Sequence, residues 1–393
     1  MSLRKIALIW KILIAIVFGL LFGLFLPQAI IRVFMTFNAI FSQFISFLVP
    51  LIIVGLVTPA IARMGSGAGK LLLLTVIIAY SSTVLAGLFS FSVSSGLFPA
   101  IIGNQAISNT SSGQYVVDPY FSVAIPPMLD VMTALVFAFI CGIFLAAIEG
   151  HYLRNVFFDF EQIVTLTISK VLIPLLPIYI FGIFLKMSFT GEALPILKVF
   201  AMVILIIFGM SIVWLLILFL IAGGVSGKNP FRSLVTMLTA YVTALGTSSS
   251  AATIPVTLRQ AVKCGVRPEV ASFTVPLCAT IHMPGSIIKI VACAITIMVA
   301  TGMEFSLGTF AGFIFLLAIT MVAAPGVPGG AIMAAIGLLS SMLGFTDADN
   351  ALIIALYMVM DSFGTACNVT GDGAVSLIID RFAKSPAEEA QQD

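Results

Sequence analysis

Residues 361–372 read DSFGTACNVTGD, a stretch that places two carboxylates among small and polar residues inside apolar sequence. Helical spacing puts Asp361, Thr365, Asn368 and Asp372 on one face, at steps of four, three and four residues. Ionisable groups inside membrane spans are rare and usually functional, so this stripe indicates ligands for cations and a polar substrate. The alternative is that the carboxylates pair structurally with lysines of neighbouring helices.

The composition of the chain requires an apolar solvent. Of its 393 residues 61% are hydrophobic and only 9% are charged, and the mean hydropathy is +1.21. A soluble domain is about 45–50% apolar and about a quarter charged, so we expect a membrane protein. The net charge of +2 with no long basic run indicates no nucleic-acid partner. The five cysteines show no Cys-x-x-Cys spacing, which favours buried thiols over disulfides or zinc.

Eight apolar segments can cross about 30 Å of hydrocarbon, and we predict an all-α membrane protein. The predicted transmembrane helices are 8–31, 38–62, 71–98, 122–148, 162–189, 194–224, 269–300 and 350–381. The first three helices therefore fall within 1–98, an external loop within 99–121, the fourth to sixth helices within 122–224, and a short tail at 385–393. Basic residues precede the first helix as in a signal peptide, but no small-residue cleavage site follows, so we expect this helix to be retained.

Two further apolar segments are interrupted at their middles. Residues 231–262 contain GTSSS at 246–250, and residues 306–345 contain PGVPGG at 325–330. Each reads as two half-helices joined by a non-helical tip, which membranes tolerate only against protein or a water-filled cavity. We therefore predict two re-entrant helical hairpins in inverted repeats. Half-helix N-termini at the Ser-rich tip would favour a substrate carboxylate. The alternative for this stretch is a flexible surface loop.

The predicted seventh helix is broken by a Pro-Gly pair, which frees backbone carbonyls of the kind that bind sodium. His282 lies at this break, either as a hydrogen-bonded structural residue or in contact with a cation or proton pathway. Lys289 lies about two turns further on, too deep to reach water easily. It needs an anionic partner, for which Asp361 or Asp372 is the natural candidate.

The basic residues indicate the orientation. With both termini in the cytoplasm of a cell-membrane protein, 13 of the 18 Lys and Arg residues fall at predicted cytoplasmic ends, and the external loop has none, which satisfies the positive-inside rule. These are Arg4, Lys5, Lys11, Arg63, Lys70, Arg154, Lys228, Arg232, Arg259, Lys263, Arg267, Arg381 and Lys384.

Four strings carry a family resemblance across nearly the whole chain: SSSAATIPVT at 248–257, SFTVPLCATI at 272–281, GVPG at 326–329 and NVTGD at 368–372. In this order they resemble the glutamate/neutral amino-acid transporter family, also called dicarboxylate/amino acid:cation symporters. The resemblance implies eight transmembrane helices, two hairpin gates, a homotrimer, and a transport domain that moves as an elevator against scaffold helices, the first of them within 1–98. It implies a transporter and not an enzyme.

The resemblance also implies roles for individual residues, with Asp361 receiving the amino group of the substrate. The implied substrate-binding residues are Ser249, Ser250, Ser286, Val327, Pro328, Gly329, Asp361, Gly364, Thr365 and Asn368. The implied sodium ligands, several through backbone carbonyls, are Cys278, Thr280, His282, Met283, Asn368 and Asp372.

Three positions depart from the family pattern. Gly364 stands where members with acidic substrates place an arginine, Pro284 where an aspartate would bind a further sodium ion, and Lys289 where some relatives have a tyrosine. The chain is similar to bacterial sodium/serine-threonine symporters in lacking that aspartate. We therefore expect fewer coupled sodium ions than the family's fullest complement, with Lys289 replacing one electrostatically, and His282 offers coupling to H+ as an alternative.

The function predicted from these residues is Na+-coupled symport of a small neutral amino acid such as serine, threonine or alanine. A buried side-chain carboxylate with no cationic partner would be unfavourable, which argues against acidic substrates. The alternative is symport of a dicarboxylate, another organic acid or an acidic amino acid, with Lys289 as the partner of the anion. A channel, or a hydrolase using Ser250 and His282, has little support because no Ser–His–acid arrangement is visible.

Overall fold

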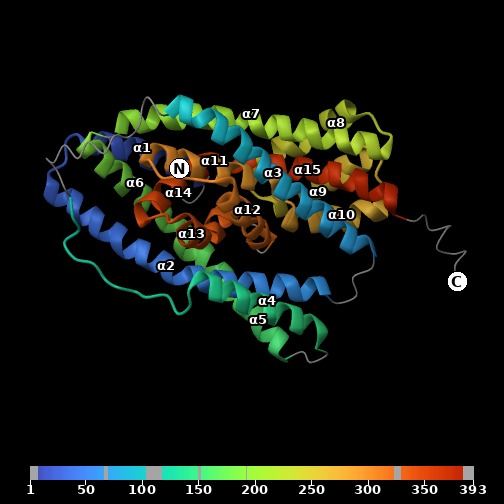
Figure 1. Cartoon of the computed structure of the whole chain (residues 1–393), viewed down its shortest axis with the longest axis horizontal. Coiled ribbons are helices and arrows are strands. Elements are labelled where there is room, and N and C mark those ends of the chain that lie inside the picture. Colours follow the sequence, from blue (N-terminus) through green and yellow to red (C-terminus); the bar gives the residue numbers. More distant parts are fainter. Residues whose placement is uncertain are drawn as a thin grey trace, which may run out of the picture.

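The fold was obtained as a computed structural model that describes residues 8–65, 70–102, 117–148, 152–191, 193–322 and 329–383. Within these ranges the chain is helical and contains no strand (Figure 1). The helices are α1 Leu8–Gly23, α2 Gln28–Gly65, α3 Lys70–Ile102, α4 Val131–Ala147, α5 Tyr152–Thr167, α6 Ile173–Thr190, α7 Ala193–Ser226, α8 Pro230–Thr247, α9 Ser250–Lys263, α10 Pro268–Ile281, α11 Pro284–Thr301, α12 Leu307–Val322, α13 Gly330–Leu343, α14 Asp347–Val359 and α15 Asp361–Phe382, with a π-helical turn, η3 Ile168–Leu172, joining α5 to α6.

Four predicted spans differ from the observed helices. The first break follows Gly23 instead of residue 31, because Pro27 cannot continue a helix, and α2 then begins at Gln28 instead of residue 38. The fifth span begins at Tyr152 instead of residue 162. The fourth span starts at Val131 and not at 122. A pair of prolines precedes it, and Asp130 caps its N-terminus by accepting the backbone N–H groups of the two residues after Val131.

Both predicted hairpins are helix pairs. Helices α8 and α9 pack against each other, as do α12 and α13. Asn229 caps α8, which ends at Ser248 in the left-handed conformation, and Ser249 caps α9. The tip of the second hairpin, including the predicted site residues Val327 and Pro328, lies outside the described residues, which resume at Gly329.

The predicted seventh and eighth helices are both interrupted. Helix α10 ends at Ile281 and α11 begins at Pro284, as the Pro-Gly pair indicated. The prediction of one continuous eighth helix is wrong, because α14 and α15 meet at a bend of 61°. The bend lies at Met360, whose φ of −100° and ψ of 4° fall in the bridge region of backbone space. No proline or glycine marks this point in the sequence.

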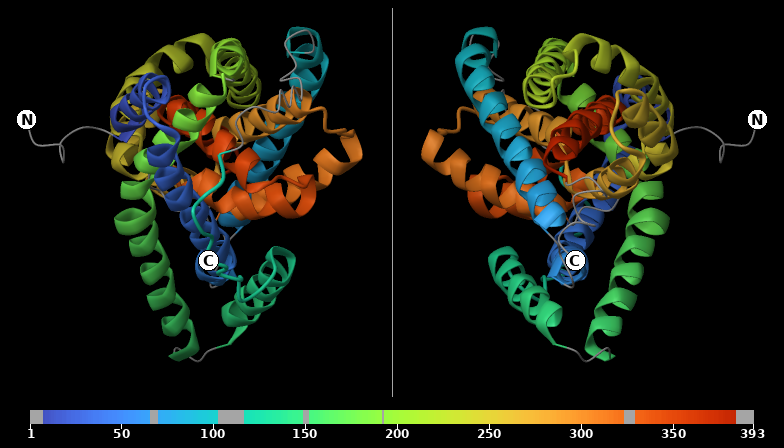
Figure 2. Two further views of the ribbon diagram at one scale, coloured as in Figure 1. Left: turned by 90° about the vertical axis from the view of Figure 1, so that its left-hand side faces the viewer. Right: turned by 90° about the vertical axis from the view of Figure 1, so that its right-hand side faces the viewer.

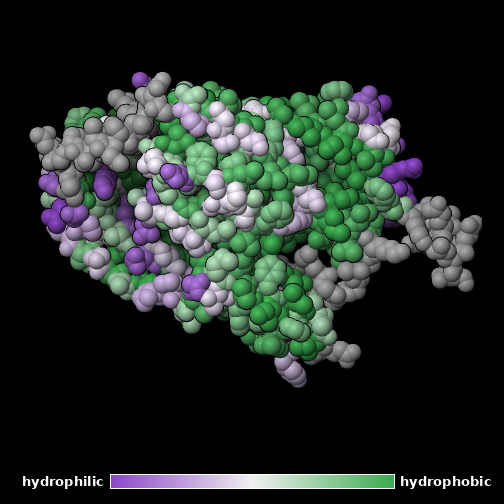
Figure 3. Space-filling model, viewed as in Figure 1, coloured by the Kyte–Doolittle hydropathy of each residue, from purple (hydrophilic) through white to green (hydrophobic). Residues whose placement is uncertain are grey.

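Hydropathy and helix length together identify a multi-pass membrane protein. Among the described residues, five helices are long and apolar enough to cross a membrane, or six if the bent pair α14–α15 forms one span. Helices α1, α4, α12 and α13 are apolar but shorter, so the predicted count of eight stays a prediction. Hydrophobic residues cover most of the face in Figure 3, and hydrophilic residues gather mainly toward its two ends.

The helices pack in two groups. Helices α1, α2, α4, α5 and α6 pack on one another (Figures 1 and 2). In the second group α3, α7 to α11 and α14 contact α15, and α12 and α13 join this group through α3, α11 and α14. The groups meet mainly where α12, α13 and α14 contact α1, α2, α4 and α6. Helix α15 is buried along most of its length, although it carries two aspartates, so the polar stripe lies inside protein and away from lipid.

Candidate functional site

The bend at Met360 makes Asp361 the first residue of α15, with 7% of its surface exposed. One carboxylate oxygen, Oδ2, accepts the backbone N–H of Gly329 at 2.8 Å. Gly329 is in the left-handed conformation with φ of 76°, and a Cβ there would lie 2.7 Å from Met358 Sδ. The second hairpin therefore contacts Asp361 through a backbone position that only glycine suits.

Lys289 supplies the other partner of this carboxylate. Its side chain is 1% exposed, and its Nζ lies 3.5 Å from Asp361 Oδ1. The ammonium also lies 3.4 Å from the carbonyl oxygens of Met360 and Asp361 and 3.8 Å from the centroid of the Tyr357 ring. A positive charge is thus surrounded by a carboxylate, two carbonyls and the face of an aromatic ring. Of the two candidate partners that the sequence offered, it contacts Asp361.

Gly364 creates the space for this ammonium. A Cβ on residue 364 would collide with Cε and Nζ of Lys289. The end of the lysine therefore lies where a side chain at position 364 would begin, although the two residues belong to different helices. Family members with acidic substrates have an arginine at this position. In this chain the ammonium of Lys289 lies beside it instead.

Asn368 fixes the start of α11 against α15. Its Oδ1 accepts the backbone N–H of Gly285 at 2.8 Å, and its Nδ2 donates to Ser286 Oγ at 3.1 Å. Gly285 permits this contact, because a Cβ there would lie 2.5 Å from the carbonyl oxygen of Gly364. Thr365, also in the predicted stripe, donates its hydroxyl to the carbonyl of Asp361 at 3.0 Å.

A small cavity of about 30 Å³ lies among these residues. Among the described residues that line it, Asp361 provides the only charged side chain, and the first residues of α9 and α13, Ser250 and Gly330, both border it. The lining consists of Ser248, Ser250, Ala279, Met283, Ser286, Gly330, Ala331, Tyr357, Asp361, Thr365 and Asn368. Ser249 is not in the lining, since its hydroxyl accepts the N–H of Ala252 as the cap of α9.

A second polar group lies deeper along α15. Asp372 Oδ1 is 3.0 Å from His282 Nδ1, and the other ring nitrogen of His282 is 2.9 Å from Ser82 Oγ on α3. All three side chains are buried, and Asp372 Oδ2 has no hydrogen-bond partner within the described residues. A buried carboxylate oxygen without a partner is suited to bind a cation.

The remaining predicted sodium ligands, Cys278, Met283 and Thr280, do not all point toward one place. The carbonyl of Cys278 accepts the N–H of His282 at 2.9 Å, and the N–H of Met283 donates to Thr83 Oγ1 at 3.2 Å. Thr280 is exposed, and its hydroxyl bonds the carbonyl of Leu277 within α10. The structure therefore brings Asn368, Asp372, His282 and Met283 to the break between α10 and α11, and leaves the Thr280 side chain turned to its own helix.

Sequence reasoning missed Tyr357 and Ser82. The Tyr357 ring faces Lys289, and its hydroxyl is 3.4 Å from Ser286 Oγ. Neither residue lies in a motif, and Ser82 contacts His282 across 200 positions of sequence. The spacing of four residues between Tyr357 and Asp361 only weakly indicates that Tyr357 belongs to the site. Residues at this spacing lie side by side on a straight helix, and the helix bends between them.

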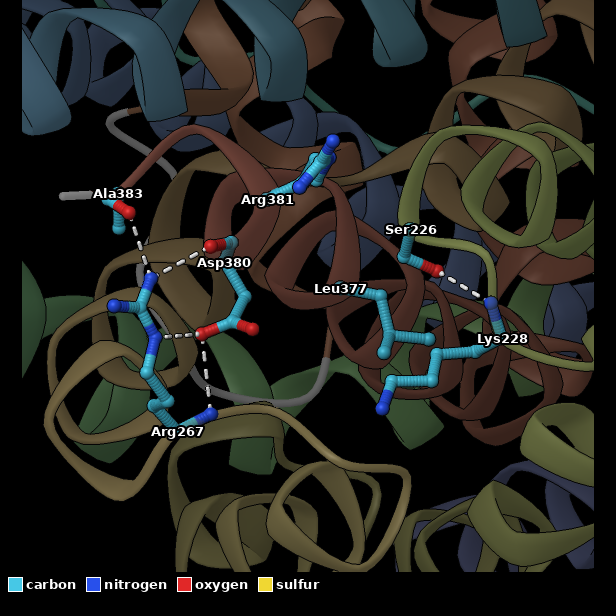
Figure 4. A pocket seen from close by; sticks show the side chains of 7 residues that line it. All are labelled: Ser226, Lys228, Arg267, Leu377, Asp380, Arg381 and Ala383. Carbon is cyan, nitrogen blue, oxygen red and sulfur yellow. Dashed lines mark hydrogen bonds and ion pairs between the residues drawn. The ribbon is translucent and has the colours of Figure 1, made fainter. Parts of the chain in front are cut away.

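A larger cavity, of about 350 Å³, lies at the far end of α15 (Figure 4). Arg267 ties the start of α10 to this end, since its Nε lies 2.8 Å from Asp380 Oδ1 and its guanidinium also donates to the carbonyls of Asp380 and Ala383. Lys228 and Arg381 border the same cavity. We interpret this region as a structural junction, because these contacts of Arg267 join the start of α10 to the end of α15.

Comparisons with known proteins identify relatives of the chain. A model of the sodium:dicarboxylate symporter family matches residues 8–382. The serine/threonine transporter SstT of Acinetobacter baumannii (strain AYE) is 26% identical over 402 residues, which covers 96% of this chain and 97% of that protein. Excitatory amino acid transporter 3 of Mus musculus is 29% identical over 265 residues, or 66% of this chain and 50% of that protein. The chain thus spans about half the length of this second relative.

The Asp361–Lys289 pair generates a prediction about stability. Removing one charge of a buried pair leaves the other uncompensated, at about 3–5 kcal/mol. We expect Asp361→Asn and Lys289→Met each to lower the unfolding temperature of the purified protein strongly. The double variant should recover most of the loss, because the amide introduced by Asp361→Asn would keep an acceptor for the N–H of Gly329. Lys186→Met, on an exposed lysine of α6, is the control. Additive losses in the double variant would show that the two residues are not paired.

Proposed function

Since the chain belongs to the sodium:dicarboxylate symporter family, we propose that it couples Na+ to the transport of a small neutral amino acid such as serine, threonine or alanine. The observation that carries this proposal is the lining of the small cavity, where Asp361 is the only charged side chain among the described residues. A fixed carboxylate attracts an ammonium group and repels an acid.

The other end of an amino acid finds a complementary environment in the same cavity. Helices α9 and α13 both begin at its wall, with Ser250 and Gly330. Helix N-termini carry unpaired N–H groups and a partial positive charge, which favour a carboxylate. An ammonium at Asp361 and a carboxylate between the two hairpins therefore account for both charged groups of an α-amino acid. Neither Lys289 nor another cationic residue is among the described residues that border the cavity, which favours neutral substrates.

An acidic substrate is the second candidate, and Lys289 is the observation that favours it. Its ammonium lies beside Gly364, close to the place where relatives with acidic substrates supply an arginine. A small movement of this side chain toward the cavity would provide a partner for a second carboxylate. The relatives support both candidates, because one is named as a serine/threonine transporter and another as an excitatory amino acid transporter.

Ligand-dependent stabilisation distinguishes the candidates. A ligand that binds the folded state raises the unfolding temperature, and the rise grows with the ratio of the ligand concentration to its Kd. We expect serine, threonine or alanine to raise this temperature in sodium chloride and to have little effect in potassium chloride. In the Lys289→Met background, Asp361→Asn should weaken serine binding by more than about tenfold, because a desolvated charge pair is lost, worth about 2–5 kcal/mol. Stabilisation by aspartate or succinate, with none by serine, would replace the first candidate by the second.

We also propose that Asp372 and Asn368 belong to one retained sodium site. The buried oxygen Oδ2 of Asp372, which has no partner among the described residues, supports this role. Pro284 cannot replace the carboxylate of a further site, and Lys289 adds a positive charge nearby, so a second cation there is unfavourable. Coupling to H+ through His282 is the alternative.

The sodium count tests this part of the proposal. Reversal potentials in proteoliposomes, at varied sodium, pH and membrane potential, should give fewer sodium ions per substrate than relatives that keep the missing aspartate. Asp372→Asn should abolish sodium stimulation, whereas Thr280→Ala should affect it less because Thr280 bonds within α10. A full sodium count would contradict the missing site. Uptake driven by a pH gradient and indifferent to sodium would instead support His282.

We further propose that the protein works by an elevator mechanism and forms a homotrimer. Its two helix pairs would be re-entrant hairpins, and both termini would lie in the cytoplasm. Two packing groups support the elevator, with α1, α2 and α4 to α6 as scaffold and α3 and α7 to α15 as the moving part. Exposed apolar side chains on α4 and α5, such as Phe144 and Val156, offer a surface for subunits and lipid. Native mass spectrometry should detect three chains per particle, and a monomer under mild detergent would contradict the trimer.

A further inference from the structure

Lys289 has a role that the neutral-substrate proposal does not use. Its ammonium occupies a ligand set that suits a monovalent cation: Asp361 Oδ1 at 3.5 Å, carbonyl oxygens of Met360 and Asp361 at 3.4 Å, and the Tyr357 ring at 3.8 Å. All four groups belong to the bend between α14 and α15. A fixed positive charge therefore already lies on the carboxylate that the substrate ammonium would contact.

The contacts of this ammonium are loose. Hydrogen bonds between an ammonium and oxygen are usually about 2.7–3.2 Å long, whereas those of Lys289 Nζ are 3.4 to 3.5 Å. By contrast, the N–H of Gly329 approaches the same carboxylate to 2.8 Å. The lysine is thus held by charge more than by directed bonds, and a better-placed ammonium can displace it from Oδ1.

The site around the pair is narrow. Its cavity, as lined by the described residues, measures about 30 Å³, and Gly329, which directly precedes α13 of the second hairpin, is bonded to Asp361. Closing this hairpin over an uncompensated carboxylate would be unfavourable, because the charge would lose water and gain no counter-charge. Lys289 provides that counter-charge, so the site can close without a substrate.

We propose that Lys289 acts as a tethered substitute for the substrate ammonium, which allows the empty carrier to close and return across the membrane. Substrate ammonium and Lys289 then alternate at Asp361, and the charge beside this carboxylate stays compensated in both states. The protein would therefore carry out net uptake and would not be restricted to exchange. This inference rests on the proposed function and deepens it, because it concerns the return of the empty carrier after the substrate has been released.

Flux measurements test the return step. Net uptake of labelled L-serine into empty proteoliposomes requires the empty carrier to return, whereas exchange against internal L-serine does not. We expect Lys289→Met to lower the ratio of net uptake to exchange by at least about tenfold, since the closed empty state loses its stabilising charge. Lys186→Met, on the exposed face of α6, should leave this ratio unaltered.

A glycine variant provides an independent route to the same state. Gly364→Ala places a methyl group against Cε and Nζ of Lys289 and should push the ammonium off Asp361, which reproduces the lowered ratio. Gly209→Ala in α7 is the matched control, because nothing lies within 4 Å of a Cβ at that position. An unaltered ratio in Lys289→Met would overturn the inference. Loss of serine binding in that variant would also overturn it, because Lys289 would then be a partner of the substrate.

A second measurement needs no substrate and therefore separates this inference from the proposed function. Ala331 borders the cavity and is 7% exposed, so a cysteine at this position reports closure. In substrate-free protein, Ala331→Cys should react slowly with a water-soluble methanethiosulfonate reagent, and adding Lys289→Met should accelerate the reaction at least about tenfold. Equal rates would overturn the role of Lys289 even if serine is transported. Failure of serine to be carried in either flux mode would reject the substrate, and the cysteine rates would still decide the role of Lys289.

Discussion

A carboxylate buried in a low-dielectric interior needs a positive partner, and at the centre of this protein that carboxylate is Asp361. Its pairing with Lys289 explains features that otherwise look unrelated. The bend at Met360 turns two carbonyls toward the ammonium, and Gly364 leaves room for the end of the lysine. The second hairpin completes the arrangement, because the N–H of Gly329 bonds the carboxylate oxygen that Lys289 leaves free.

The same arrangement connects the fold to symport. Broken helices place three helix ends around one small cavity, because α9, α13 and α15 each begin with a residue that lines it. We propose that this site takes up a zwitterion and that Lys289 compensates Asp361 when the zwitterion leaves. A deeper pair, Asp372 with His282, lies on the same helix and keeps one carboxylate oxygen without a partner in the described part of the chain. The proposed substrate and cation sites thus share α15, which would couple their occupancies.

Much of this organisation could be predicted from the sequence, because it depends on local pattern. Interrupted apolar runs indicated both helix pairs, and helical spacing placed Asp361 and Asp372 on one stripe. Pro27 marks the early break before α2, although hydropathy alone continues across it. The bend at Met360 was not readable, since no helix-breaking residue marks it and its carbonyl is held by Lys289 from another helix. The choice between two aspartates as partner of Lys289 likewise depended on tertiary contacts.

We propose that the substrate ammonium and Lys289 alternate at Asp361. Experimental structures of the protein with sodium and L-serine, and without ligand, would test this alternation. In the complex we expect the serine ammonium within hydrogen-bond distance of Asp361, the Lys289 ammonium withdrawn from that carboxylate, and the serine carboxylate at the start of α9 and α13. A complex in which Lys289 stays paired with Asp361, or binds a carboxylate of the ligand, would show that the two ammonium groups do not alternate.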